Sequence, residues 1–98
     1  MIRHTVSFSL VHAPDSPEER EFLTSAPALL SAIDGVQDFT VSRQVSPKST
    51  YRFQFAMSFA DAATFAAYDG HPDHQGFVAT RWQSEIAEFE ELDFIAYP

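Results

Sequence analysis

The sequence predicts a single α+β domain with the element order β-α-β-β-α-β, the split βαβ or ferredoxin-like arrangement. Two kinds of spacing lead to this prediction. Apolar and polar residues alternate in stretches typical of half-buried strands, and between those stretches apolar residues recur at helical spacing. The chain has 98 residues, 45% of them hydrophobic, which is enough for one small core. The expected strands are residues 2–10, 39–45, 50–59 and 89–97.

The first helix is bounded by recognisable signals. Ser16 is expected as the N-cap, Pro17 as the first helical residue and Glu19 as the third, which together form a capping box. Pro27 interrupts the helical spacing, and we expect it to kink or split the helix because proline has no backbone N–H to donate. The Asp-Gly pair at 34–35 predicts the end of the helix.

The second helical region is expected in two pieces. Asp61 is suited to cap a helix that runs to about Asp69, after which Gly-His-Pro at 70–72 breaks it. Pro72 is well placed as the first residue of a new helical segment, which continues through Trp82. The chain then enters its last strand.

One face of the predicted sheet carries small and nearly uncharged side chains. The apolar strand residues should pack on the helices, and a sheet face open to water more often carries Lys and Glu. We therefore expect a second copy of the chain to cover this face and to complete a dimeric α/β barrel. A solvated face on a monomer is the alternative. The residues of this face are Thr5, Ser7, Ser9, Thr40, Ser42, Gln54, Ala56 and Ser58.

Composition argues against several classes of function. The net charge of −8 and the six scattered Lys and Arg residues disfavour a nucleic-acid partner, because phosphate binding needs clustered basic residues. We expect no membrane association, since no segment resembles a membrane span or a signal peptide. The lack of cysteine excludes disulfides and thiolate sites and is typical of a cytoplasmic protein. No nucleotide- or flavin-binding fingerprint is present, so we expect no cofactor.

The residues suited to chemistry concentrate in one short segment, which contains Tyr68, His71 and His74. Two imidazoles and a phenol within seven residues are groups that can move protons near neutral pH. His4 belongs with them because it interrupts an apolar strand face. A metal site at His71, Asp73 and His74 is disfavoured, because nearly contiguous residues around a proline do not readily converge on one ion. We therefore expect no metal.

This layout resembles the stress-responsive A/B-barrel family, also called the Dabb domain. The resemblance rests on the Arg3-His4 start of the first strand, the Tyr68…His71-Pro-Asp-His74-Gln-Gly-Phe77 segment, and the Leu92-Asp93-Phe94 close of the last strand. It covers essentially the whole chain, so residues 1–98 are expected to form one such domain. The family implies a dimeric barrel with a pocket between the sheet and the helices of each subunit. Its characterised members include a plant polyketide cyclase and a plant hydroxynitrile lyase, whereas many others are described only as stress-responsive.

The resemblance also implies roles for individual residues. Tyr68 and His74 match the acid/base pair of the family's cyclase, and His4 matches a His that lines its pocket. Asp93 matches, with a one-residue shift, the carboxylate that orients the catalytic His. The cyclase carries a His in its central strand where this chain has Phe53.

Each of these residues has a functional and a structural interpretation. At the start of a helix, a neutral His74 is suited to accept a proton, and Asp93 would fix its orientation. Tyr68 would hydrogen-bond a carbonyl oxygen as negative charge develops on it. In the structural interpretation, Tyr68 and His4 are core residues and His74 is a helix-start residue with a structural hydrogen bond. The residues expected to bind the substrate are His4, His71, Phe53, Phe77 and Trp82.

The sequence thus favours a cofactor-independent cyclase or lyase that acts on a small carbonyl or polyketide-like compound. His74 would remove a proton next to a carbonyl, Tyr68 would stabilise the enolate oxygen, and Asp93 would orient His74. The alternative is a non-catalytic homodimeric stress-response or ligand-binding protein. A pocket into which Tyr68 and His74 both point favours chemistry, whereas a cluster sealed by aromatic side chains favours structure. A solvated acidic face is expected at Glu85, Glu88, Glu90 and Glu91.

Overall fold

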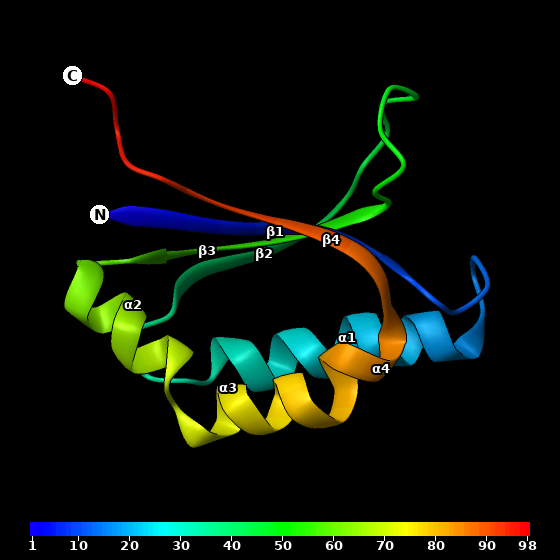
Figure 1. Cartoon of the computed structure of the whole chain (residues 1–98), viewed down its shortest axis with the longest axis horizontal. Helices are drawn as coiled ribbons and strands as arrows, with labels where there is room; N and C mark the ends of the chain where they lie inside the picture. The colour runs from blue at the N-terminus through cyan, green and yellow to red at the C-terminus, as the bar shows by residue number, and fades with distance from the viewer.

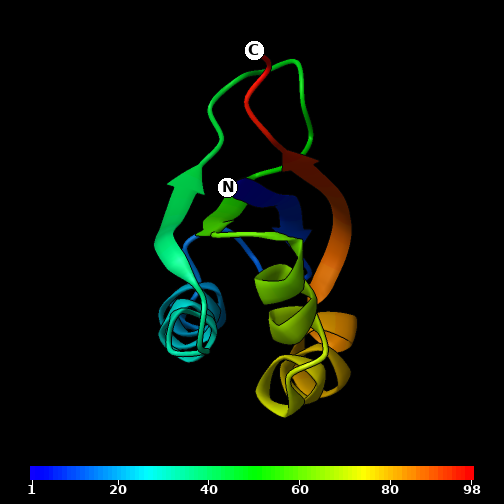
Figure 2. The same ribbon diagram turned by 90° about the vertical axis from the view of Figure 1, so that its left-hand side faces the viewer.

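The fold has two layers, a four-stranded antiparallel sheet and a set of helices that covers only one of its faces (Figures 1 and 2). The computed structural model describes all 98 residues. The strand order is β2-β3-β1-β4, and the predicted element order is confirmed. The strands are β1 (Ile2–Leu10), β2 (Gln37–Arg43), β3 (Phe53–Phe59) and β4 (Ile86–Phe94).

The helices follow the predicted division, with one unusual turn. The last three helical pieces form one continuous segment, because the backbone keeps right-handed helical angles at their junctions. Its middle piece is π-helical, a geometry that often occurs at functional sites. No helix has both the length and the apolar character that a membrane crossing requires. The pieces are α1 (Pro17–Ser31), α2 (Ala62–Asp69), α3 (Pro72–Phe77), the π-turn η1 (Val78–Trp82) and α4 (Gln83–Glu85).

The strand ends differ from the prediction. The last strand is predicted at 89–97 but runs from Ile86 to Phe94. Its length is set by pairing with β1, in which Leu10 lies opposite Ile86 and Arg3 lies opposite Phe94. The second strand begins and ends two residues earlier than predicted and the third begins three residues later, since residues 44–52 form the connection between them. Val45 in this connection is 84% exposed, so it does not belong to the buried strand face to which the alternation assigns it.

For α1, the N-cap prediction is confirmed, and the expectation that Pro27 could split the helix is wrong. The Ser16 hydroxyl accepts a hydrogen bond from the Glu19 N–H at 3.2 Å, and the Glu19 carboxylate accepts one from the Asp15 N–H. The helix nevertheless runs unbroken through Pro27. A proline inside a helix costs about 3 kcal/mol, whereas burial of the apolar helix face, with Phe22 at its centre, contributes about 2 kcal/mol for each large side chain.

The connection after α1 packs directly on α2. Gly35 has a φ of +91°, in the left-handed region that favours glycine, as the predicted helix end at 34–35 requires. A Cβ at this position would lie 2.4 Å from Cγ2 of Thr64. Asp61 caps α2 as predicted, with its carboxylate 2.8 Å from the Thr64 N–H. The same helix carries Tyr68, so this contact helps to hold one of the candidate site residues.

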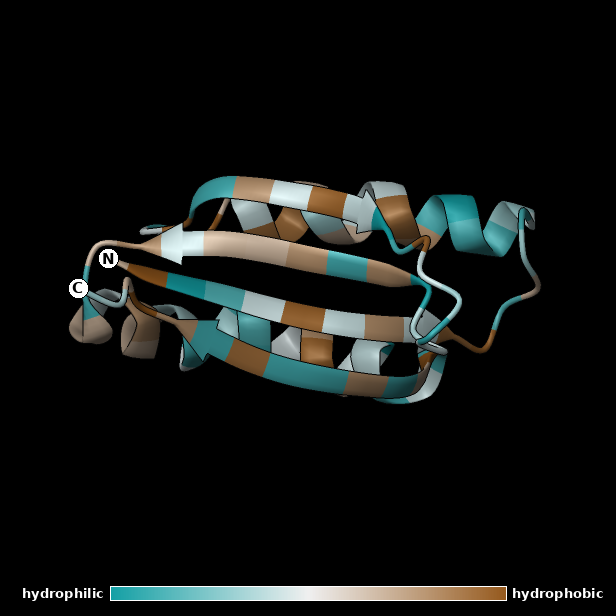
Figure 3. Ribbon diagram, turned by 90° about the horizontal axis from the view of Figure 1, so that it is seen from above, coloured by the Kyte–Doolittle hydropathy of each residue, from teal (hydrophilic) through white to brown (hydrophobic).

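The two faces of the sheet differ as the alternation predicts. The pairs His4–Met57 and Val6–Phe55 belong to the face that packs on the helices. Figure 3 looks onto the opposite face, which no helix covers. The register places Leu92 and Phe94 of β4 on this uncovered face, where each is about half exposed. The core consists mainly of aromatic residues, among them Phe8, Phe22, Phe55, Phe59 and Tyr68.

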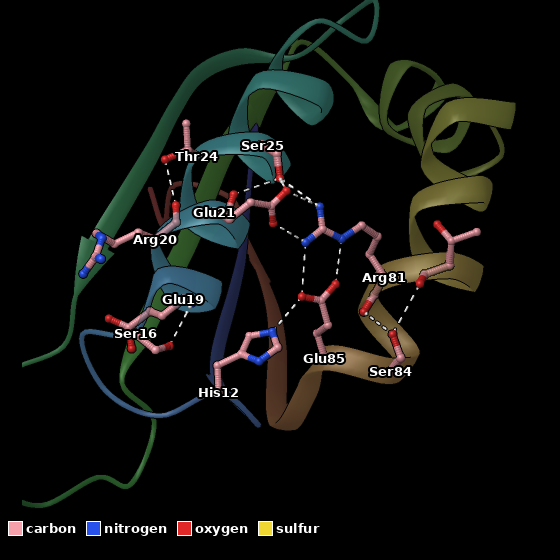
Figure 4. A network of polar contacts seen from close by, with 11 residues as sticks. His12, Ser16, Glu19, Arg20, Glu21, Thr24, Ser25, Arg81, Ser84 and Glu85 are labelled. Atoms are coloured by element: carbon pink, nitrogen blue, oxygen red, sulfur yellow. Dashed lines mark hydrogen bonds and ion pairs between the residues drawn. The ribbon is translucent and has the colours of Figure 1, made fainter.

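A polar network joins the last helical segment to α1 (Figure 4). The Arg81 guanidinium donates hydrogen bonds to both carboxylate oxygens of Glu21 and of Glu85. Hydrogen bonds from Arg81 hold the pKa of both carboxyl groups below the ordinary range. The His12 Nε2 lies 2.7 Å from a Glu85 oxygen. The network therefore fixes η1, and with it Trp82, relative to α1.

Candidate functional site

A cavity of about 210 Å³ lies between the sheet and the helices. Nine of its 13 lining residues are hydrophobic when Tyr68 is counted among them, and the residues that carry polar groups come from four elements of the fold. Two larger and more open depressions, of about 400 and 550 Å³, contain no His or Tyr. The polar residues of the cavity are His4 from β1, Tyr68 and Asp69 from α2, His74 from α3 and Glu91 from β4.

Tyr68 presents a free hydroxyl to this cavity. The residue is 2% exposed, and no hydrogen bond joins its hydroxyl to another residue. No fully buried side-chain polar atom lacks a partner, so the Tyr68 oxygen must be accessible from the cavity that the residue lines. Burial raises the pKa of this phenol well above its ordinary value, and the charges of Asp69 and Glu91 add to the effect. The hydroxyl therefore remains a hydrogen-bond donor across the neutral pH range.

His74 lies at the third position of α3, as predicted, with its ring against Tyr68. The two ring centroids are 4.6 Å apart. The His74 Nδ1 is 2.9 Å from the backbone carbonyl oxygen of Asp69. Because a carbonyl oxygen can only accept, Nδ1 carries the proton, and Nε2 of a neutral ring remains an acceptor. The local fold thus selects the tautomer of His74.

His4 is held between two carboxylates of β4. Its Nδ1 lies 2.5 Å from Asp93 Oδ1, and its Nε2 lies 3.4 Å from Glu91 Oε1. The antiparallel register explains this, since it places Asp93 directly opposite His4 and Glu91 opposite the next inward-facing residue. His4 is 4% exposed, and its ring centroid is 6.4 Å from that of Tyr68. His4, held by Asp93 and facing Glu91, therefore forms part of the cavity wall.

The structure corrects one predicted partnership. Asp93 contacts His4 and not His74, because the register of β4 fixes its side chain beside β1 and the Asp69 carbonyl already occupies Nδ1 of His74. The other predicted site residues divide into two groups. His4, Tyr68, His74, Phe77 and Trp82 line the one cavity.

Two residues expected to bind the substrate lie outside this cavity. His71 is the N-cap of α3, where its Nδ1 accepts a hydrogen bond from the Asp73 N–H at 3.0 Å. Phe53 is 2% exposed and lies in the core, with the guanidinium of Arg43 5.5 Å from its ring centroid. No group of three or more His, Asp or Glu side chains is placed to hold a metal ion.

Sequence reasoning missed two charged residues of the cavity. Glu91 is assigned to a solvated face by its position in an acidic run, and half of its side chain is indeed exposed. Strand alternation is the signal that could have placed Glu91 at the cavity, because residues two positions apart, such as Glu91 and Asp93, lie on the same face of a strand. Asp69 follows Tyr68 directly at the end of α2 and borders the same cavity.

Comparisons with known proteins identify the family. The model of the Stress responsive A/B Barrel Domain (Dabb) matches residues 2–96. A Dabb family protein with a ferredoxin-like fold from Mesorhizobium loti is 49% identical, with 99% of this chain and 97% of that chain covered and a TM-score of 0.98. No curated protein gives a significant match.

More distant solved structures share the fold. A hydroxynitrile lyase from Passiflora edulis is 13% identical, with 98% of this chain and 93% of that chain covered and a TM-score of 0.79. A dimeric ferredoxin-like protein of unknown function from Thermobifida fusca is 23% identical, with 97% and 90% covered and a TM-score of 0.73. With its family model matched over almost its full length, the chain belongs to the stress-responsive A/B-barrel (Dabb) domain family.

Proposed function

We propose that this protein is a cofactor-independent acid/base enzyme, a cyclase or lyase that acts on a small carbonyl compound. The observation that carries the proposal is the unpartnered hydroxyl of Tyr68, which opens into the same cavity as His74. An apolar protein cavity of about 150 Å³ can hold benzene. A cavity of about 210 Å³ therefore suits a compound with one substituted ring.

The chemistry assigned to these groups is proton transfer. Nε2 of His74 accepts a proton, either from the carbon next to a carbonyl or from the hydroxyl of a hydroxynitrile. The Tyr68 hydroxyl donates a hydrogen bond to the carbonyl oxygen, where negative charge develops in enolisation. In enolisation the imidazolium then returns the proton to carbon, and in hydroxynitrile cleavage the departing cyanide takes up a proton. General-base catalysis of this kind contributes about 10²- to 10⁴-fold to the rate.

We assign Asp93 to the positioning of His4. Its carboxylate accepts from Nδ1–H of His4, and Nε2 of that ring, which lines the cavity, lies 3.4 Å from the Glu91 carboxylate. This arrangement supports a second acid/base group on the sheet side, opposite the helix that carries His74. The fold similarity to the Passiflora edulis hydroxynitrile lyase supports lyase chemistry as one form of the reaction.

We also propose that the protein acts as a cytoplasmic homodimer without nucleic-acid or membrane partners. The uncovered sheet face carries small side chains beside the half-exposed Leu92 and Phe94. A second copy packed on this face would bury those residues. The relative from Thermobifida fusca is described as dimeric, which supports the same assembly.

Two reactions with simple probes test the proposal. Benzoylacetone in D₂O reports enolisation through loss of its α-proton NMR signals, and mandelonitrile reports cleavage through release of benzaldehyde. We expect catalysis of at least one reaction and a loss of about 10²-fold or more in His74→Ala. The variant should remain folded, because the Asp69 carbonyl keeps a second hydrogen bond from the Gln75 amide at 2.9 Å.

The matched control is His71→Asn, which removes an imidazole outside the cavity and retains a good N-cap residue. This variant should keep the wild-type rate. Unchanged turnover in His74→Ala would contradict the assigned base.

The second candidate is a non-catalytic ligand-binding homodimer, which the predominantly apolar lining of the cavity also suits. The His ring signals in NMR separate the two functions. Shifts of the His4 and His74 signals on addition of benzoylacetone, without turnover of any probe, would favour the binding protein. Turnover that depends on His74 favours the enzyme.

A further inference from the structure

The cavity combines apolar walls with an excess of negative charge, and we infer that it admits uncharged single-ring carbonyl compounds and excludes carboxylates. This inference rests on the proposed function, since it concerns the same cavity, and it adds the charge class of the ligand. Asp69 and Glu91 belong to the lining, and Asp93 lies directly behind His4. No Lys or Arg is part of the lining.

Two basic residues on elements that line the cavity, Arg81 and Arg3, are engaged elsewhere. Arg81 donates hydrogen bonds to Glu21 of α1 and to Glu85 of α4 (Figure 4). Arg3 of β1 donates to the Asp38 carbonyl and to Thr40, on the sheet face away from the helices. Neither guanidinium is therefore left to pair with an anionic ligand in the cavity.

The imidazoles do not reverse this balance. His4 already lies between Asp93 and Glu91, so any positive charge on its ring is matched locally. Even with both His4 and His74 protonated, the three carboxylates around the cavity would outnumber them. A ligand carboxylate would lose part of its hydration on entry and meet like charges on carboxylate side chains that are about half exposed. A neutral carbonyl group has no such penalty, and its oxygen can accept from the free hydroxyl of Tyr68.

A pair of ligands of almost identical shape tests the inference. The amide 4-formylbenzamide is uncharged, whereas 4-formylbenzoate is an anion at about pH 8. We expect the wild-type protein to bind the benzoate at least about tenfold more weakly than the benzamide, measured as dissociation constants by NMR titration of the His ring signals. Tenfold corresponds to about 1.4 kcal/mol.

The source of the selectivity is tested with the double variant Asp69→Asn, Glu91→Gln. Its two dissociation constants should agree within about threefold, because the two carboxylates of the lining have been removed and the remaining one, Asp93, is paired with His4. The matched control is Glu18→Gln, Asp34→Asn, which lowers the net negative charge equally at exposed positions outside the cavity lining. The control should retain the wild-type selectivity.

Each outcome has a distinct meaning. Equal or tighter binding of the benzoate by the wild type overturns the inference and leaves the proposed enzyme intact. Failure of both ligands to bind overturns the inference together with the ligand cavity on which the proposed function depends. Selectivity that persists in the double variant refutes the assignment to Asp69 and Glu91.

Discussion

Replacement of Tyr68 by Phe tests whether the phenol faces the cavity as a buried neutral group. The variant keeps the ring and its contacts with Phe59 and His74, whose centroids lie 5.0 and 4.6 Å from that of Tyr68. It removes only a hydroxyl that has no hydrogen-bond partner in the protein. At neutral pH we therefore expect the free energy of unfolding to change by less than about 1 kcal/mol.

The same substitution should change the pH dependence of stability. Burial raises the pKa of Tyr68 above its ordinary value of 10.0, so the folded protein keeps a proton that the unfolded chain releases. The contribution of this group is fully present below about pH 10 and is lost as the pH rises toward the folded pKa. Relative to the Phe variant, the wild type should lose about 1.4 kcal/mol of stability per pH unit above about pH 10.

Urea denaturation at a series of pH values from about 8 to about 11.5 measures this difference, with the fluorescence of Trp82, the single tryptophan, as the signal. The difference between the two proteins should be flat at the lower pH values and should then fall. A flat difference over the whole range would refute the reasoning, since the phenol would then titrate alike in the folded and unfolded states. In the benzoylacetone assay, the variant should be about 10²-fold slower than the wild type.

Three further substitutions probe the scaffold by thermal and urea denaturation. Gly35→Ala should destabilise the fold by about 2–4 kcal/mol, because it adds a Cβ at positive φ 2.4 Å from Thr64 Cγ2. Addition of Thr64→Ser should recover the steric part of this loss while keeping the hydroxyl that binds Asp61. No recovery of stability in the double variant would refute the clash. Pro27→Ala should stabilise α1 by about 1–3 kcal/mol, since it restores a backbone donor inside a continuous helix, and a loss of stability would contradict this. Hydrogen bonds from Arg81 lower the pKa of Glu85 below its ordinary 4.5, so the stabilisation from this carboxylate is present above about pH 4.5 and is lost as the pH falls through the folded value. Glu85→Gln should remove this part of the acid sensitivity of stability. An unchanged dependence of stability on acid pH would show that the network of Figure 4 does not persist in solution.

The fold could be predicted because each of its elements has a local cause in the sequence. The strand alternation gives the inward phase directly, and Ser16 and Asp61 mark helix starts through hydrogen bonds that form within three residues. Pro27 shows the limit of such local rules. Its cost is opposed by burial of a helix face against strands that are distant in sequence, and no local pattern reports that burial.

The candidate site could be predicted only in part, for a related reason. Tyr68 and His74 belong to one helical region, so their proximity follows from a short segment of chain. The partner of Asp93 depends on how β4 is aligned against β1, across 89 positions of sequence. A shift of one residue in that alignment reverses the face of every β4 side chain. The same alignment places Glu91 at the cavity, which the acidic run alone could not indicate.

In the proposed enzyme, the corrected pairing gives each of two imidazoles a fixed orientation. The Asp93 carboxylate holds Nδ1 of His4, and a backbone carbonyl holds Nδ1 of His74. Nε2 of His74 has no partner in the protein, whereas Nε2 of His4 lies 3.4 Å from Glu91, and the two rings belong to opposite layers of the domain. A strand and a helix start allow less motion than a loop, so the geometry needed for reaction is set before a ligand binds. Val78 and Trp82 of the π-turn line the same cavity, and the hydrogen bonds between Arg81 and α1 hold this turn in place. These hydrogen bonds therefore help to fix the cavity wall, although they lie outside the cavity itself.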